Sequence, residues 1–357
     1  MKQFFIFRSG FSIFSVIGIN QKLIGKVSRI FFIIFFMLSL SMMISCDDDD
    51  GSCNIGHGTR FVIVGYDGKS YYSSNLSCWK ESNTGVTNHL YSIASDGSRF
   101  VAVGKNGTVI ISTDGGETWN NSDYQGTFHL NDVVSLGNNR WMAAGDSGTV
   151  IESTDAGDSW TELTTPHVAN LRGIATNGNS GVVAAGNVSP IYTSNGGVTW
   201  LDSGYNFNLP TNDVAYGGGN YVAVGSYPLI YRSGSSGGSW ISEYPEIYIG
   251  YRAVEYDARA NPAWLTVSGA GRAVGANNIH YWNEKHGPWF GAQNNNLSNL
   301  TNDGGDWVIL GGYGKVYRQA GNYNWDEYTI STNTFLSDIA CDDPGQVGTT
   351  PTSTCLF

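Results

Sequence analysis

The stretch that decides the fold runs from Leu90 to Trp119 and reads LYSIASDGSRFVAVGKNGTVIISTDGGETW. It contains short apolar runs rich in Val, Ile and aromatic residues, separated by Gly, Asn, Asp and Ser. Runs of this composition are typical of β-strands, and the polar breaks are typical of turns. The next stretch, from Leu130 to Trp160, repeats the same order as LNDVVSLGNNRWMAAGDSGTVIESTDAGDSW. The chain is therefore expected to consist of copies of one antiparallel β unit.

A tryptophan closes each copy of this unit. The gaps between successive members are 40, 41, 40, 40, 49 and 36 residues, and the members are Trp79, Trp119, Trp160, Trp200, Trp240, Trp289 and Trp325. A period near 40 residues, with three or four short strands per unit, is typical of a β-propeller blade. The sequence thus predicts an all-β, seven-bladed β-propeller with four-stranded blades. The long interval before Trp289 predicts an irregular sixth blade, which is the blade where function-specific sequence is most worth seeking.

The turn that precedes the tryptophan resembles the Asp-box, or bacterial neuraminidase repeat, with the pattern S-x-D-x-G-x-T-W. Its aspartate is expected to accept hydrogen bonds from the turn, its glycine to allow positive φ, and its indole to be buried. A ligand-binding aspartate is the alternative, but a site is rarely repeated in every unit, so a structural role is favoured. The two clearest copies provide the residues Ser112, Asp114, Gly116, Trp119, Ser153, Asp155, Gly157 and Trp160.

The two ends of the repeat region complement each other. Residues 59–65 match residues 98–104, but the chain lacks the strand that should precede them. Residues 335–343 supply that strand after the last tryptophan. Pairing the last strand with the first unit removes the open edges of the ring. We therefore expect the propeller over residues 59–343, with its first blade closed by the C-terminal strand, and a C-terminal tail over residues 344–357.

The N-terminal segment has a different composition from the repeats. The first 46 residues contain five Lys or Arg and no acidic residue, and an apolar stretch leads to Cys46. This pattern resembles a bacterial lipoprotein signal, which predicts a signal peptide over residues 1–45 and a lipidated Cys46 followed by an acidic linker to residue 58. A transmembrane anchor is the alternative, although the stretch is shorter than the ~20 residues that span a bilayer. Either way, an exported protein anchored to the membrane of the bacterial envelope is expected, on its periplasmic face or at the cell surface.

The charge balance limits the classes of partner. The chain has 19 basic and 30 acidic residues, and five of the basic ones lie in the predicted signal. An acidic mature protein is a poor ligand for nucleic acid and for anionic lipid headgroups. No nucleic-acid partner is therefore expected.

Four cysteines follow Cys46, which allows three ways of forming two disulfides. A bond between Cys53 and Cys341 would join the two ends of the ring, and Cys78 and Cys355 would remain as the second pair. Free thiols are the alternative. No CxxC or His-rich spacing occurs, so neither a metal site nor a cofactor is expected.

No recognisable catalytic motif occurs in the sequence. Sialidases share the Asp-box but also need an arginine triad, a tyrosine nucleophile and an Arg-Ile-Pro element, and this chain has no Arg-Ile-Pro. The motifs GxSxG and HExxH and a phosphate-binding loop are missing as well. His89 and His129 share one position of the repeat, and Arg60, Arg99 and Arg140 share another, so these side chains are expected to have structural roles. We therefore do not expect an enzyme, and a glycoside hydrolase is the alternative.

The faces and the central channel of a propeller are its usual binding sites. If the first strand of each unit is innermost, two residues per blade face the channel or its rim. Aromatic residues in the adjoining loops could contact a protein or a glycan, or could pack over the blade edges. The candidate binding residues are Arg172, Arg252, Asp132, Asp213, Asp338, Tyr205 and Phe207.

Residues 100–119 and 141–160 resemble repeats of the photosystem II stability/assembly factor family, and the resemblance covers nearly all of residues 59–343. It implies a non-catalytic binding or assembly-scaffold protein that contacts a protein partner through its faces and central channel. The same blades also occur in sialidases and other hydrolases, so a glycan-binding or glycan-hydrolysing propeller is the alternative. The expected partner is thus an unidentified protein or a surface glycan.

Overall fold

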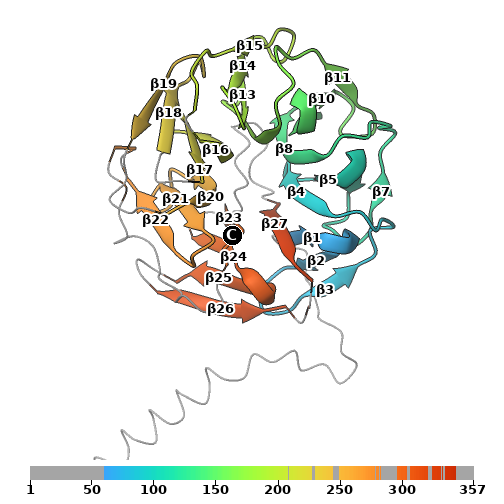
Figure 1. The fold of residues 1–357 in the computed structure, drawn as a ribbon. Coiled ribbons are helices and arrows are strands. Elements are labelled where there is room, and N and C mark those ends of the chain that lie inside the picture. The colour runs from blue at the N-terminus through green and yellow to red at the C-terminus, as the bar shows by residue number, and fades with distance from the viewer. Residues whose placement is uncertain are drawn as a thin grey trace, which may run out of the picture. The chain divides into compact units, whose positions relative to one another are not determined.

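The structure is a computed structural model, and it describes residues 60–342 except 208, 227–229, 244–248, 278, 281, 283–295, 304–305, 321–323, 331 and 333. These residues form seven antiparallel sheets, which are arranged as blades around a central channel (Figure 1). Within each blade, consecutive strands pair with one another from the channel outward. The predicted seven-bladed β-propeller is confirmed.

We number the blades in chain order from the sheet that contains the first strand. Blade 1 consists of β27 (Leu336–Cys341), β1 (Phe61–Gly65), β2 (Ser70–Ser73) and β3 (Lys80–Ser82). Blade 2 consists of β4 (Leu90–Ser95), β5 (Phe100–Gly104), β6 (Val109–Ser112) and β7 (Asn120–Asn121). Blade 3 consists of β8 (Leu130–Gly137), β9 (Arg140–Gly145), β10 (Val150–Ser153) and β11 (Thr161–Leu163). Blade 4 consists of β12 (Leu171–Thr176), β13 (Val182–Gly186), β14 (Ile191–Thr193) and β15 (Leu201–Asp202).

The remaining blades follow the same order. Blade 5 consists of β16 (Thr211–Gly217), β17 (Asn220–Gly225), β18 (Ile230–Gly234) and β19 (Trp240–Glu243). Blade 7 consists of β23 (Asn299–Asn302), β24 (Trp307–Leu310), β25 (Lys315–Gln319) and β26 (Trp325–Thr329). Blade 6 has three strands among the described residues, namely β20 (Tyr251–Tyr256), β21 (Trp264–Ser268) and β22 (Ala273–Ala276).

The hydrophobic core lies between the blades. Each of seven clusters of buried side chains joins one blade to the next. The strand β1 shows the reason, because Phe61 and Ile63 pack toward blade 7 whereas Val62 and Val64 pack toward blade 2. A strand buried on both faces needs a continuous apolar run instead of an alternating one. Burying one such side chain contributes about 1.5–3 kcal/mol.

One member of the tryptophan series differs from the sequence prediction. Six of the seven core clusters contain one of the tryptophans predicted to close a blade, but the cluster between blades 5 and 6 contains Trp282. The Trp282 indole N–H donates to the carbonyl of Ile279, three residues earlier, at 2.8 Å. Trp240 makes the same bond to Gly237. Trp282 therefore closes blade 6, at intervals of 42 and 43 residues from its neighbours, and Trp289 lies outside the described residues.

The Asp-box turn of blade 2 is held together by its own side chains. The Asp114 carboxylate accepts hydrogen bonds from the backbone N–H of Thr118 at 2.9 Å and from its hydroxyl at 2.5 Å. The Ser112 hydroxyl donates to Asp114 and accepts from the N–H of Gly116, whose φ is +85°. The Trp119 indole is buried against blade 1 and donates to the Ser82 hydroxyl at 3.3 Å.

The turn of blade 3 repeats these contacts. Asp155 accepts from the N–H and the hydroxyl of Ser159, and Ser153 accepts from the N–H of Gly157, whose φ is +97°. The Trp160 indole donates to the Gly157 carbonyl at 2.8 Å. In both copies, the polar groups of the aspartate are used within the turn.

The ring is closed by the last strand. Strand β27 pairs antiparallel with β1, with Ile339 opposite Ile63 and Cys341 opposite Phe61 (Figure 1). This confirms the predicted closure of the first blade. Cys78 and Cys341 are both disulfide-bonded. Cys53 lies outside the described residues, so the pairing of Cys53 with Cys341 stays a prediction.

The predicted signal peptide, Cys46, the acidic linker before Arg60 and the C-terminal tail also lie outside the described residues. Among the residues that are described, no helix has the length and apolar character needed to cross a membrane.

Candidate binding surfaces around the central channel

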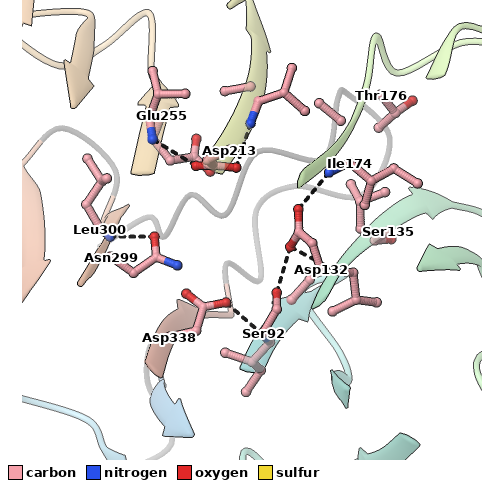
Figure 2. Close-up of a pocket in the computed structure, with 18 of the residues that line it drawn as sticks. Ser92, Asp132, Ser135, Ile174, Thr176, Asp213, Glu255, Asn299, Leu300 and Asp338 are labelled. Carbon is pink, nitrogen blue, oxygen red and sulfur yellow. Dashed lines mark hydrogen bonds between the residues drawn. The ribbon is translucent and has the colours of Figure 1, made fainter. Parts of the chain in front are cut away.

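The innermost strands surround a cavity of about 100 Å³ in the channel. Its polar lining comes from one or two positions on each inner strand, as Figure 2 shows, and includes Ser92, Asp132, Asp213, Glu255, Asn299 and Asp338. Three of the candidate binding residues, the aspartates at 132, 213 and 338, thus come together in one place.

Each of these aspartates ties its own blade to the next one. Asp338 accepts a hydrogen bond from the N–H of Ile93 in blade 2, Asp132 from Ile174 in blade 4 and Asp213 from Val254 in blade 6, each at 2.8 Å. The other carboxylate oxygen accepts from the N–H of the residue that follows the aspartate, at 2.7–2.9 Å. The donors lie on inner strands, which are edge strands whose N–H groups on the channel side lack a strand partner. The aspartates satisfy this edge.

At the position of these aspartates, the residue type alternates from blade to blade around the channel. Blades 1, 3 and 5 carry aspartate at this position, whereas blades 2, 4 and 6 carry Ser92, Gly173 and Ala253. Of these small residues, Ser92 donates to the Asp132 carboxylate of the next blade at 2.7 Å. Seven is odd, so strict alternation cannot close the ring. The seventh position is the neutral Asn299, which accepts from the N–H of Leu300 at 2.7 Å.

Burial changes the acidity of these carboxyl groups. Desolvation, only partly offset by the hydrogen bonds that it accepts, raises the pKa of Asp132 to about 6. The same cause raises the pKa of Asp338 to about 7. Desolvation and the nearby charge of Asp132 raise the pKa of Asp213 well above its usual range. Within the described part of the chain, no group of His, Cys, Asp or Glu side chains is arranged to hold a metal ion.

The two candidate arginines lie at the start of inner strands and are exposed. Arg172 donates to the Asn212 side chain at 3.1 Å, and Asn212 in turn donates to the carbonyl of Tyr251 at 2.7 Å. Arg252 follows Tyr251 directly. Both guanidinium groups therefore lie at the same mouth of the channel, which we call the arginine mouth. Tyr91 occupies the same strand position in blade 2.

Phe207 and Tyr205 do not form an exposed aromatic pair. Phe207 is only 3% exposed and stacks on Tyr231 at 4.1 Å, with the Trp240 ring edge-on at 5.4 Å. Tyr205 packs against the same cluster. For Phe207, the packing role that the sequence left open is thus the one that the structure supports.

The repeated histidines and arginines contact neighbouring blades. The Nδ1 atoms of His89 and His129 accept hydrogen bonds from the backbone N–H of Asp67 and Asn106 in the preceding blade, at 2.9 and 3.2 Å. Arg140 donates to the carbonyl of Gly196 in the Asp-box turn of the next blade at 2.9 Å. The expected structural roles of these repeat positions have a concrete basis in these bonds.

Comparisons with known proteins give the family. The model of the family described as photosynthesis system II assembly factor YCF48 matches residues 72–341. A structure of YCF48 bound to a D1 peptide is 19% identical, with a TM-score of 0.54 over 67% of this chain and 81% of that chain. YCF48 from Cyanidioschyzon merolae is 17% identical, with a TM-score of 0.50 over 67% and 84%. A chain of the nidogen/laminin complex is 12% identical, with a TM-score of 0.52 over 80% and 99%.

No curated protein matches the chain in sequence. At these identities the solved structures show a shared fold, whereas the family model spans most of the chain. The protein therefore belongs to the family of the photosynthesis system II assembly factor YCF48.

Proposed function

We propose that this protein is a non-catalytic scaffold of the bacterial envelope that binds a protein partner at the arginine mouth. The carrying observation is the contrast between two adjacent positions near the start of the inner strands, the second with the arginines and the third with the aspartates. The buried aspartates of the cavity accept backbone N–H groups of neighbouring blades, whereas Arg172 and Arg252 remain exposed at the mouth. Exposed arginines at the centre of a surface are frequent anchors of protein interfaces.

The family supports a protein ligand. A structure of YCF48 was solved with a D1 peptide bound, and this chain belongs to the same family. The absence of catalysis is also part of the proposal. The carboxyl groups with the largest pKa shifts are occupied by hydrogen bonds to the backbone, so they are poorly placed to exchange protons with a substrate.

The interaction can be tested by cross-linking and pull-down from native membranes, followed by mass spectrometry. With the double variant Arg172→Ala/Arg252→Ala, we expect the amount of the main partner recovered to fall at least about fivefold. The matched control is Lys80→Ala, on the outer strand β3 of blade 1. An unchanged set of partners would contradict the proposal. So would hydrolysis of a glycan by the purified propeller, if one carboxylate substitution abolished it.

The tether is proposed from the sequence of the N-terminal segment. Lipid attachment at Cys46 would keep the propeller at the membrane, within reach of membrane-bound partners. We expect the wild-type chain to incorporate labelled palmitate and to sediment with membranes, whereas Cys46→Ala should do neither. Membrane association that persists without lipid in Cys46→Ala would favour a transmembrane anchor instead.

A further inference from the structure

One interface between blades departs from a pattern that three other interfaces share at the arginine mouth. In blades 1, 2 and 3 the second and third strands are joined by a 3₁₀ turn: η2 (Tyr66–Gly68), η3 (Lys105–Gly107) and η4 (Asp146–Gly148). The central residue of each turn has φ of +57°. Its backbone N–H donates a hydrogen bond to a side chain of the next blade. The acceptors are His89, His129 and Asn170 for the turns of blades 1, 2 and 3 respectively. The central residues themselves are Asp67, Asn106 and Ser147.

At the interface of blades 7 and 1 both partners of this contact have changed. The turn η6 (Gly312–Gly314) places Tyr313 at the central position with φ of +58°. Phe335 takes the place of His89, because its carbonyl accepts from Tyr66 as the His89 carbonyl accepts from Lys105. The Phe335 side chain has no acceptor atom. Two aromatic residues thus stand where three other interfaces have a polar contact.

This replacement is costly and leaves both rings in solvent. A bulky residue is rare at positive φ, where Asn and Asp are favoured. Tyr313 is nonetheless 67% exposed and Phe335 is 60% exposed, so neither ring gains much by burial. Strained backbone with an exposed side chain occurs preferentially at binding sites. Selection for a ligand explains this pair better than selection for stability.

The pair continues into a row of rings, which we call the aromatic strip. Phe335 lies 5.8 Å from Tyr66, which is 40% exposed and stacks on His89 at 4.2 Å. Tyr91 follows at 6.4 Å from His89 and lies 6.1 Å from His129. Except for the stacked pair, neighbouring rings are tilted by 54–57°. The strip therefore crosses blades 1 to 3 at the arginine mouth.

The geometry favours a polypeptide over a sugar. A sugar stacks on a flat aromatic platform, but neighbouring rings of the strip outside the Tyr66–His89 stack are tilted by 54–57° and form no common plane. Tilted rings leave notches between them that accept single side chains. Most of the centroids are 5.8–6.4 Å apart, close to the ~6.6 Å between alternate residues of an extended strand. At the far end, Asn131 bonds to the carbonyl of Leu171, directly before Arg172, so a cationic group follows the strip.

We propose that the aromatic strip, with Tyr313 beside it, binds an extended segment of a partner protein that carries apolar side chains at alternate positions and an acidic side chain toward Arg172. The inference rests on the proposed protein-binding function. It adds the chemistry of the bound segment and places the apolar contacts at the interface of blades 7 and 1.

The test uses a double variant that restores the common contact. Tyr313→Asn/Phe335→His recreates the Asn106–His129 pair of blades 2 and 3. We expect it to melt at or above the wild-type temperature, because asparagine tolerates positive φ and histidine supplies the acceptor. The probe is a phage-displayed library of random dodecapeptides, selected on the folded wild-type propeller. Enriched peptides should show the alternating apolar pattern with an acidic residue, and should bind the double variant at least about tenfold more weakly.

Several results would overturn the inference. A fall in melting temperature in the double variant would show that the two rings serve the fold. Enriched peptides that bind both forms equally, no enrichment, or an oligosaccharide that binds wild type but not the double variant would also contradict it. If the peptides bind Tyr313→Asn/Phe335→His as tightly as wild type but no longer bind Arg172→Ala/Arg252→Ala, only this inference fails. If no peptide is enriched and no partner is cross-linked in membranes, the proposed function fails with it.

Discussion

At the scale of single residues, the Asp-box aspartate shows how one side chain organises a turn. Burial opposes the ionisation of Asp114, but the hydrogen bonds from Thr118 and Ser112 together outweigh it and hold the pKa of Asp114 below its usual range. In blade 4 the same position is Asn195, whose side-chain oxygen accepts from Thr193 and from the N–H of Thr199. The turn thus needs an acceptor at this position more than it needs a charge.

This leads to a prediction about two substitutions at one position. Asp114→Ala removes the acceptor for Thr118, and we expect it to lower the free energy of unfolding by about 1–3 kcal/mol. Asp114→Asn keeps one acceptor and should cost less than half as much. Urea denaturation of the two variants measures the difference. If the alanine and asparagine variants were equally unstable, the charge and not the acceptor would hold the turn.

At the scale of elements, each inner strand lacks a strand partner on its channel side. They are edge strands, and β-bulges beside Ser92, Asp132, Gly173, Asp213 and Ala253 shift their register against the second strand. The aspartate of one blade then reaches the N–H of the next blade. Neighbouring inner strands must approach closely for this bond, and the residue at the crossing point limits how closely they can do so.

Gly173 provides a test of this close approach. A Cβ atom at this position would lie 2.8 Å from the N atom of Val214 and 2.9 Å from the Cα atom of Asp213, both in the backbone of blade 5. We expect Gly173→Ala to destabilise the propeller by about 1–3 kcal/mol, as overpacking against rigid atoms does. The control is Gly234→Ala in β18, where the added Cβ meets no atom within 4 Å. Equal stabilities of the two variants, measured by thermal melting, would refute the expected clash.

At the scale of the whole molecule, the ring collects buried carboxyl groups at its centre. An unfolded aspartate has a pKa of about 3.9, whereas the pKa of folded Asp132 is about 6 and that of Asp338 is about 7. Between these values the folded state binds more protons than the unfolded state, so the free energy of unfolding falls as pH rises. This contribution is fully present below about pH 4 and is lost as pH passes through 6 to 7.

The predicted pH dependence can be measured by urea denaturation at pH 5, 6, 7 and 8. Stability should fall by about 1.4 kcal/mol per pH unit for each excess proton. Asp303, whose pKa burial raises to about 6, acts in the same direction. The pKa of the Asp155 carboxyl is lowered chiefly by the hydrogen bond from the Ser159 hydroxyl. Carboxyl groups with a lowered pKa change the free energy of unfolding only at lower pH. Asp338→Asn should flatten the profile. A stability that is constant or rises over this range would disprove the prediction.

The sequence alone determined the fold, because the information that specifies a blade is local. Short apolar runs, turn residues and a closing tryptophan recur within about 40 residues. The strand expected before residues 59–65 is supplied by residues 335–343, and this complement revealed how the ring closes. The sequence did not reveal the role of Trp282, because its turn has lost the Asp-box pattern. Its burial between blades 5 and 6 and its indole hydrogen bond to Ile279 identify it in the structure.

The tertiary structure decided what the channel and the mouth consist of. The pattern placed Asp132, Asp213 and Asp338 near the axis, but only the packing of neighbouring blades shows that each accepts an N–H from the next blade. The aromatic strip also needed the fold, since Phe335 and Tyr66 lie far apart in sequence and meet only when the ring closes. Local patterns specify the repeats, whereas contacts between repeats depend on a geometry that no single repeat contains.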